Sequence, residues 1–367
     1  MNANCRAGVF LLCLSWASLP VFAQLQTGPM PAGGQLQSPP ISHAGDRIVL
    51  DVVVTDKAGK PVKGLEEKDF SVLDNGHPQS LQSFQAMGGV AAADVKPAEP
   101  PVKVIMLIDE VNTNFNRVAY ERDEIKKFLL QNNGVLPYPT SFSFFSDTGV
   151  QTQEGYSRDG NALLAMFEQH ETALRSIRRG EGFYGAVERF QLSLNTLNSL
   201  VAKEGPTPGR KIVIWISPGW PILSGPGIEL TAKNQAGLFA SVVAASTALR
   251  LARITLYSVD PQGAEAAGGL REFYYQDFLK PAAAAKNTQA GNLALQVLAV
   301  QSGGLALPAS NDITAQLMHC VTDVDAVYTL TIDPAHADRP NEFHTIQVKV
   351  ATPGLTARTR NGYYAQP

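Results

Sequence analysis

The sequence predicts an α/β fold: a doubly wound, mostly parallel sheet with flanking β strands that form a small β-sandwich-like unit. Two observations lead to this prediction. Between residues 102 and 326, short apolar runs such as 102–108 and 211–216 alternate with segments of helical periodicity, which is typical of parallel strands joined by helices. On either side, residues 45–86 and 327–367 consist mainly of strand-like runs and turns.

Length, composition and charge set the first limits. The chain has 367 residues, of which 44% are hydrophobic and 17% are charged, so two or three packed units are expected. Its formal net charge is −3, and its basic runs are no longer than pairs such as Lys126-Lys127. Without a broad basic surface, nucleic acid is not an expected partner.

The N-terminus has the pattern of a secretory signal peptide. Residues 1–23 contain Arg6, then an apolar run from Gly8, then a small residue at Ala23. A retained membrane anchor is the alternative, but the apolar run is short and is broken by Pro20. We therefore expect a secreted or periplasmic protein, cleaved near Ala23, with no membrane span after cleavage.

Signal cleavage would change the cysteine count. It would remove Cys5 and Cys13 and leave Cys320 without an internal disulfide partner. Cys320 is expected to be a small buried side chain, and an intermolecular bridge is the alternative.

Two segments are predicted to be linkers, and a small β unit lies between them. Residues 24–44 are rich in Pro, Gly, Gln and Ser, and residues 87–101 are rich in Ala, Gly and Pro. The β unit spans residues 45–86, with strands expected at 47–56, 71–73 and 81–84 and a hairpin turn at Asp74-Asn75-Gly76.

The α/β domain is expected to span residues 102–326. Its strands are predicted at 102–108, 140–145, 149–154, 211–216 and 254–259, and its helices at 118–130, 159–170, 182–201, 230–253 and 293–301. Right-handed crossovers would place the helices on both faces of the sheet.

The last segment, residues 327–367, returns to strands. They are predicted at 328–332, 344–350 and 355–360, with an aromatic tail at 362–365. Residues 344–350 alternate strictly, so one face of that strand should be buried. These strands could extend the central sheet or pair with the first β unit, and the sequence does not choose.

Polar residues follow two of the buried strands. Asp109 ends the run 102–108 and is followed by Asn112 and Thr113, whereas Ser217 follows the run 211–216. Ligands of open α/β sheets gather outside the carboxyl ends of the strands. We therefore interpret these residues as the partner-binding edge, and Glu110 beside them as a solvated residue.

A loop of Gly and Pro at residues 219–227 should lie by the same edge. It carries Trp220, Ile222 and Leu223, and exposed apolar residues on such a loop suit a protein-docking surface. Trp220 therefore joins the predicted partner-binding edge. The alternative is that the loop folds back onto its own domain.

Beyond these patterns, the chain resembles the von Willebrand factor type A (vWA) domain, and residues 45–365 resemble vWA-related proteins of the acidobacterial type. The motifs that carry the likeness are Leu50-Asp51-Val52-Val53-Val54-Thr55-Asp56, Asp69-Phe70, Asp74-Asn75-Gly76, Ile108-Asp109 with Asn112-Thr113, and Pro353-Gly354-Leu355 with Gly362-Tyr363-Tyr364-Ala365. The resemblance implies a vWA, Rossmann-like fold and an adhesion-type partner, either a protein or a cell-surface component.

The resemblance also implies a metal-ion-dependent adhesion site, in degenerate form. Asp109 matches the first ligand of the Asp-x-Ser-x-Ser motif and Thr113 its last hydroxyl. The sequence departs from the family at Val111, which replaces the middle hydroxyl, and at Ser217, which stands where Asp is expected. The second loop, residues 180–184, offers no Thr.

Two interpretations of this degenerate site follow. In the first, Asp109 and Thr113 are ligands of Mg²⁺ or another divalent cation, which oxygen atoms prefer to bind. In the second, Asp109 accepts hydrogen bonds from loop amides while Asn112 and Thr113 satisfy the turn.

Three functions are weighed on this basis. The first is a non-enzymatic, adhesion-type module for protein–protein interaction, and the second is a metal-independent structural scaffold of the cell envelope. The third is a hydrolase that uses Ser217, with Asp260 and a later His in the hydrolase order. We expect the first, and the sequence does not indicate the oligomeric state.

Overall fold

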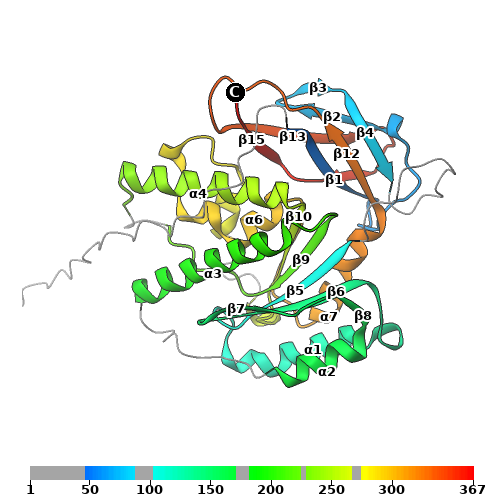
Figure 1. Cartoon of the computed structure of the whole chain (residues 1–367), viewed down its shortest axis with the longest axis vertical. Helices are drawn as coiled ribbons and strands as arrows, with labels where there is room; N and C mark the ends of the chain where they lie inside the picture. Colours follow the sequence, from blue (N-terminus) through cyan, green and yellow to red (C-terminus); the bar gives the residue numbers. More distant parts are fainter. Residues whose placement is uncertain (1–45, 87–101, 171–181, 225–228, 267–273) are drawn as a thin grey trace, which may run out of the picture.

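The computed structural model describes residues 46–86, 102–170, 182–224, 229–266 and 274–367 (Figure 1). Several expectations fall outside these residues: the signal peptide 1–23, the linkers 24–44 and 87–101, and parts of two loops at 180–181 and 225–227. Among the described residues, no helix has the length and apolar character needed to cross a membrane.

The central sheet has seven strands, and its order is β11-β10-β9-β5-β6-β7, with β8 also paired to β6. The strands are β5 (Lys103–Asp109), β6 (Val135–Ser146), β7 (Gly149–Thr152), β8 (Ser157–Asp159), β9 (Lys211–Ile216), β10 (Ile254–Val259) and β11 (Ala306–Leu307). All pairs are parallel except those of β7 and β8 with β6. The predicted mixed α/β fold with a mostly parallel sheet is confirmed.

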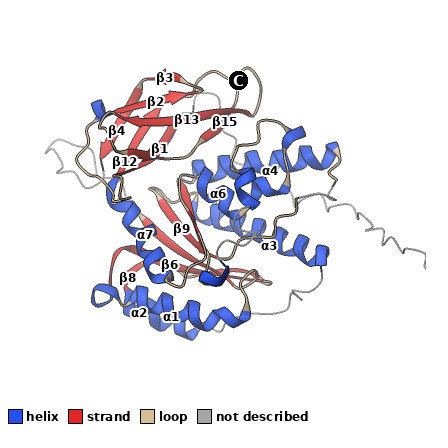
Figure 2. Cartoon of the chain, turned by 180° about the vertical axis from the view of Figure 1, so that it is seen from behind, coloured by secondary structure: helices blue, strands red, loops and turns tan. Residues whose placement is uncertain are grey.

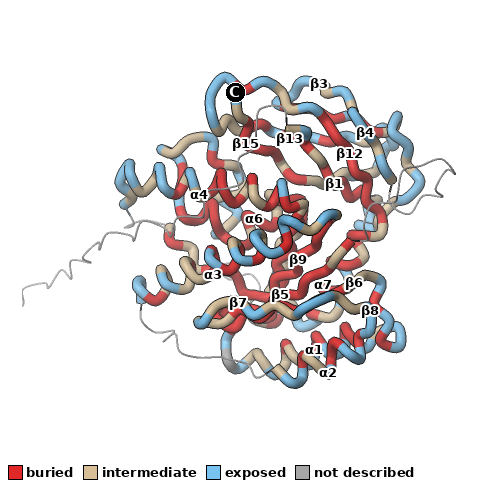
Figure 3. Tube along the Cα trace, in the orientation of Figure 1, coloured by how far each residue is buried: buried red, intermediate tan, exposed pale blue. Residues whose placement is uncertain are grey.

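Helices cover both faces of this sheet (Figures 1 and 2). On one face lie α1 (Val118–Leu129), α2 (Gly160–Gln169) and α7 (Ile313–Thr322), and on the other α3 (Gly182–Glu204), α4 (Ala232–Leu251) and α6 (Leu295–Gln301). Strand residues alternate between the two cores: Met106 packs with the first set and Leu107 with the second. Both faces of β5 and β9 are therefore buried (Figure 3).

The remaining strands form two four-stranded sheets, ordered β14-β1-β12-β4 and β15-β13-β2-β3. They are β1 (Ile48–Thr55), β2 (Phe70–Asp74), β3 (His77–Gln79), β4 (Leu81–Ala86), β12 (Val327–Ile332), β13 (Glu342–Val350), β14 (Thr356–Arg358) and β15 (Gly362–Ala365). Side chains of both sheets share one core, including Leu50, Tyr328 and Val348. The C-terminal strands thus pair with the N-terminal β unit, as a sandwich.

A buried ionic cluster joins the sandwich to the α/β domain. Asp51 of β1 accepts hydrogen bonds from Arg253 (2.6 Å) and Thr329 (3.1 Å), and Arg210 lies 3.8 Å away. Burial pushes the pKa of Asp51 upward, but the charges of Arg210 and Arg253 outweigh it and hold the pKa below its ordinary value. The carboxylate is therefore charged and stabilising at neutral pH.

We expect Asp51→Asn to lower the free energy of unfolding at pH 7 by about 3 kcal/mol, because the buried Arg210 and the half-buried Arg253 lose their anion. Urea denaturation measures this loss. The native pKa is depressed, so the contribution of Asp51 should disappear as the pH falls below the ordinary value of 3.8.

The exposed pair Arg47–Asp333 provides the control. Asp333→Asn should change stability by about 0.5 kcal/mol or less. Equal effects of Asp51→Asn and Asp333→Asn would contradict the role of the buried cluster.

Candidate functional site

The carboxylate of Asp109 is the hydrogen-bonding centre of the carboxyl edge. It ends β5, is completely buried, and accepts through Oδ1 from the backbone N–H groups of Val111 (3.0 Å) and Asn112 (2.8 Å). Through Oδ2 it accepts from Asn112 Nδ2 (2.9 Å), Trp215 Nε1 (3.2 Å) and Ser217 Oγ (2.7 Å). One side chain thereby ties the loop after β5 to the end of β9.

These donors do not fit a cation at Asp109. Two carboxylate oxygens offer about four lone-pair sites, and the N–H and O–H groups just named occupy them. A metal would have to displace hydrogen bonds from Asn112, Trp215 or Ser217. Among the described residues, no three or more His, Cys, Asp or Glu side chains are grouped to hold a metal. Asp109 itself is arranged as in the second interpretation, because loop amides satisfy it. The rest of that interpretation does not hold, since Asn112 Oδ1 and Thr113 Oγ1 are buried and have no hydrogen-bond partner among the described residues.

The predicted partner-binding edge is not accessible. Asp109, Asn112, Thr113, Ser217 and Trp220 are all buried, with exposed fractions between 0% and 9%. The structure brings the first two and Ser217 together by hydrogen bonds. Neither they nor Thr113 can meet a partner without a rearrangement of the loops.

The expected exposure of the loop after β9 is wrong. Trp220 and Leu223 are only 1% and 4% exposed, and the Trp220 ring packs edge-on against Trp215 with centroids 5.1 Å apart. Burial of the indole ring removes a large apolar surface from water, and this stabilises the folded position of the loop. The described part of the loop, residues 219–224, folds back onto its own domain, which was the alternative.

Ser217 is held within this cluster too. Its hydroxyl donates to Asp109 and accepts from the backbone N–H of Gly219 (3.1 Å). It has no exposed surface, so a substrate would have no access to it in this conformation.

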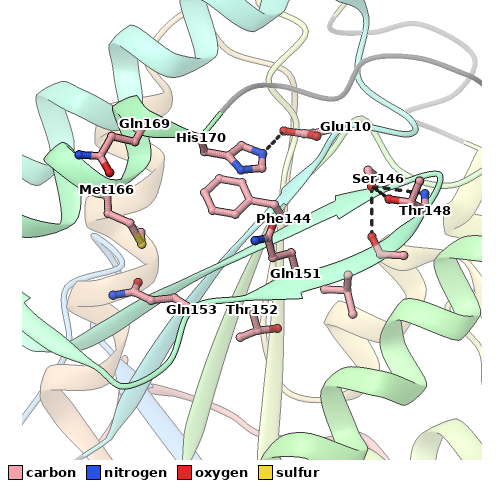
Figure 4. Close-up of a pocket in the computed structure, with 12 residues that line it drawn as sticks. Glu110, Phe144, Ser146, Thr148, Gln151, Thr152, Gln153, Met166, Gln169 and His170 are labelled. Atoms are coloured by element: carbon pink, nitrogen blue, oxygen red, sulfur yellow. Dashed lines mark hydrogen bonds and ion pairs between the residues drawn. The ribbon is translucent and has the colours of Figure 1, made fainter.

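A groove that the sequence analysis missed opens beside the buried cluster (Figure 4). Its volume is about 580 Å³. It is lined by Glu110, Phe144, Ser146, residues 148–153, Met166, Gln169 and His170. These residues belong to the end of β5, the β6–β7 hairpin and the end of α2. The groove therefore lies between the β6–β7 hairpin and the end of α2.

A carboxylate and an imidazole form one end of the groove. Glu110 Oε1 lies 2.8 Å from His170 Nε2, and only 2% of the Glu110 side chain is exposed. The His170 ring stacks on Phe144 at 3.6 Å. The expectation that Glu110 is solvated is therefore wrong: alternation along the chain turns Glu110 away from Asp109 and toward the end of α2.

The rest of the lining consists mainly of uncharged polar side chains. Gln151, Gln153 and Gln169 contribute amides, and Ser146 and Thr148 contribute hydroxyls 2.9 Å apart at the hairpin turn. Such groups donate and accept hydrogen bonds without exchanging protons near neutral pH. The groove is thus equipped for binding a polar surface.

No protein-family model matches this chain, and no curated protein matches it. Among solved structures, it is similar to proximal thread matrix protein 1 of the mussel byssus (14% identity, TM-score 0.34, 62% of this chain and 50% of that one). It is also similar to the human COPII-coat protein Sec24c (9% identity, TM-score 0.31, 73% of this chain and 44% of that one). A third similar structure is the VWA domain of SpRpn10 (14% identity, TM-score 0.24, 48% of this chain and 95% of that one).

The chain thus spans about half the length of the first two structures. With identities and TM-scores this low, function has to be argued from the residues of this chain. The resemblance to acidobacterial-type vWA proteins stays a prediction.

A third buried acidic residue, on α1, lies near Asp109 and Glu110. Glu121 is 3% exposed, and its Oε2 has no hydrogen-bond partner among the described residues. Burial raises its pKa well above the ordinary value, and the charges of Asp109, Glu110 and Asp260 raise it further.

We expect Asp109→Asn to destabilise the protein by about 3 kcal/mol, because the new amide directs a donor at other buried donors. Thermal and urea unfolding measure the loss, with Asp123→Asn in an exposed ion pair as the control. Millimolar Mg²⁺ should leave the melting temperature of the wild type unchanged. A rise of more than about 2 °C that Asp109→Asn abolishes would contradict the hydrogen-bonded assignment.

We expect Glu121→Gln to stabilise the protein at neutral and higher pH. Because the native pKa lies above the unfolded value, wild-type stability falls as the pH rises from about 4.5 to the native pKa. The difference in unfolding free energy between the variant and the wild type should therefore grow over that pH interval and stay constant above it. Urea unfolding across pH tests this, and a stability difference that is the same at every pH would contradict it.

Proposed function

We propose that this protein is a non-enzymatic, vWA-like binding module of the adhesion type, secreted or periplasmic, that holds a protein partner in the groove beside β7. The observation that carries the proposal is the groove itself: a cavity of about 580 Å³ at the carboxyl edge, in which six of the twelve lining residues carry amides or hydroxyls. Ligands of α/β sheets usually bind in cavities at the carboxyl ends of the strands.

The amide side chains of the lining favour binding, and the acid–base pair of the groove, Glu110 and His170, is engaged with itself. Gln151, Gln153 and Gln169 can orient a ligand through hydrogen bonds but cannot act as nucleophiles or acids. The signal-peptide pattern of residues 1–23 supports a location outside the cytoplasm. Ser217 and Trp220 are buried, and of the two cavities found at this edge among the described residues the groove is the larger, at about 580 Å³ against about 110 Å³ for the one beside Pro218 and Asp260.

Site-specific photo-cross-linking in the producing cell tests the proposal. A photoreactive side chain at Gln151 or Gln169 should give an adduct with one defined protein. The matched control is Gln347, an exposed glutamine on β13 of the sandwich. Adducts from Gln347 alone would favour the scaffold function, and no defined adduct from either groove position would overturn the proposal.

The same cells test the location. We expect the mature chain to begin near Gln24 and to be recovered outside the cytoplasm, as mass spectrometry of the isolated protein would show. A chain that retains residues 1–23 in the cytoplasm would contradict it.

A further inference from the structure

The strand β7 forms one edge of the central sheet. It pairs with β6 on its inner side, and within the part of the chain that the structure describes no strand pairs with its outer side. An edge strand presents backbone N–H and C=O groups that another extended segment can pair with.

The register identifies which groups face outward. The backbone N–H of Gln153 donates to the Phe142 carbonyl at 2.9 Å, and Gln151 lies opposite Phe144. In an antiparallel pair, hydrogen-bonded and non-bonded residues alternate. Gln151 and Gln153 therefore bond inward to β6, and Val150 and Thr152 direct their backbone groups to the outer edge.

The groove follows this strand. Every residue from 148 to 153 borders the groove, and the opposite wall is formed by Met166 and Gln169 of α2 and by His170, which follows the helix (Figure 4). Because consecutive residues of the strand all border the groove, the groove runs along the strand. The four residues of β7 extend about 14 Å, the length of a short peptide segment.

From this geometry we infer that the ligand is an extended polypeptide segment that joins the sheet as a further strand along β7. The inference rests on the proposed function and specifies the partner. The backbone of the segment bonds to Val150 and Thr152. Its side chains are uncharged and polar, because the groove offers Gln151, Gln153 and Gln169 as partners and its one acid, Glu110, already contacts His170.

Backbone N-methylation tests strand addition directly. The probe is a peptide of about eight residues, long enough to cover β7, selected from a random library against the full mature protein. N-methylation at alternate positions should weaken binding about tenfold, because those amides pair with the edge. The intervening positions should tolerate it. Equal losses at all positions, or selected peptides that bind elsewhere, would overturn the inference.

Hydrogen exchange gives an independent measurement on the wild-type protein. Binding of the peptide should slow exchange of the Val150 and Thr152 amides and leave that of Gln151, already bonded to β6, unchanged. Protection of Gln151 without Val150 and Thr152 would contradict strand addition.

A variant separates backbone from side-chain recognition. Thr152→Pro removes an outward N–H without removing a bond to β6, and should lower peptide affinity about tenfold. Its control, Gln151→Ala, should lower affinity by a smaller factor. If Thr152→Pro unfolds, the N-methylation scan decides the question without it.

Two further outcomes are distinguishable. Cross-links from Gln151 without alternation in the N-methylation scan would uphold the proposed function and overturn strand addition. A dimer in sedimentation that Thr152→Pro converts to a monomer would assign the edge to a second copy of this chain, and would also overturn the inference.

Discussion

The arrangement of the carboxyl edge depends on one buried carboxylate. Asp109 has no exposed surface, and among the described residues its carboxylate accepts hydrogen bonds from N–H and O–H groups of Val111, Asn112, Trp215 and Ser217. Burial raises its pKa, and the bonds from Asn112, Ser217 and Trp215 act against that rise. These hydrogen bonds join the loop after β5 to the end of β9 through one side chain.

Ser217 decides how that carboxylate is satisfied. A second acid at this position would repel Asp109 and call for a cation between the two. A hydroxyl instead donates a hydrogen bond at 2.7 Å. At the same edge, Trp220 packs edge-on against Trp215. The crevice beside β5, where the strand order reverses and ligands usually enter, is filled by buried side chains such as Trp220, and the groove lies over β6 and β7.

The sequence was a good guide wherever a local pattern determines the outcome. Continuous apolar runs identify β5 and β9 because both faces of these strands are covered. The alternation of residues 344–350 shows that one face of β13 is buried, but not that its neighbours are β2 and β15. Trp220 was misjudged because the space above Trp215 exists only in the folded chain. The contact of Glu110 with His170 joins residues sixty positions apart, and no local pattern encodes it.

The two edges of the central sheet differ in a way that favours β7 for recognition. At the far edge, β11 has only two residues and is followed by Pro308, which cannot donate to a ladder. At the near edge, β7 has four residues, Gly149, Val150, Gln151 and Thr152, and carries no charged side chain. A short polar edge resists indiscriminate aggregation, whereas the groove beside it supplies side-chain contacts for one kind of segment. A single strand can therefore be left uncovered without becoming an aggregation site, provided that it is brief, polar and walled on one side by α2.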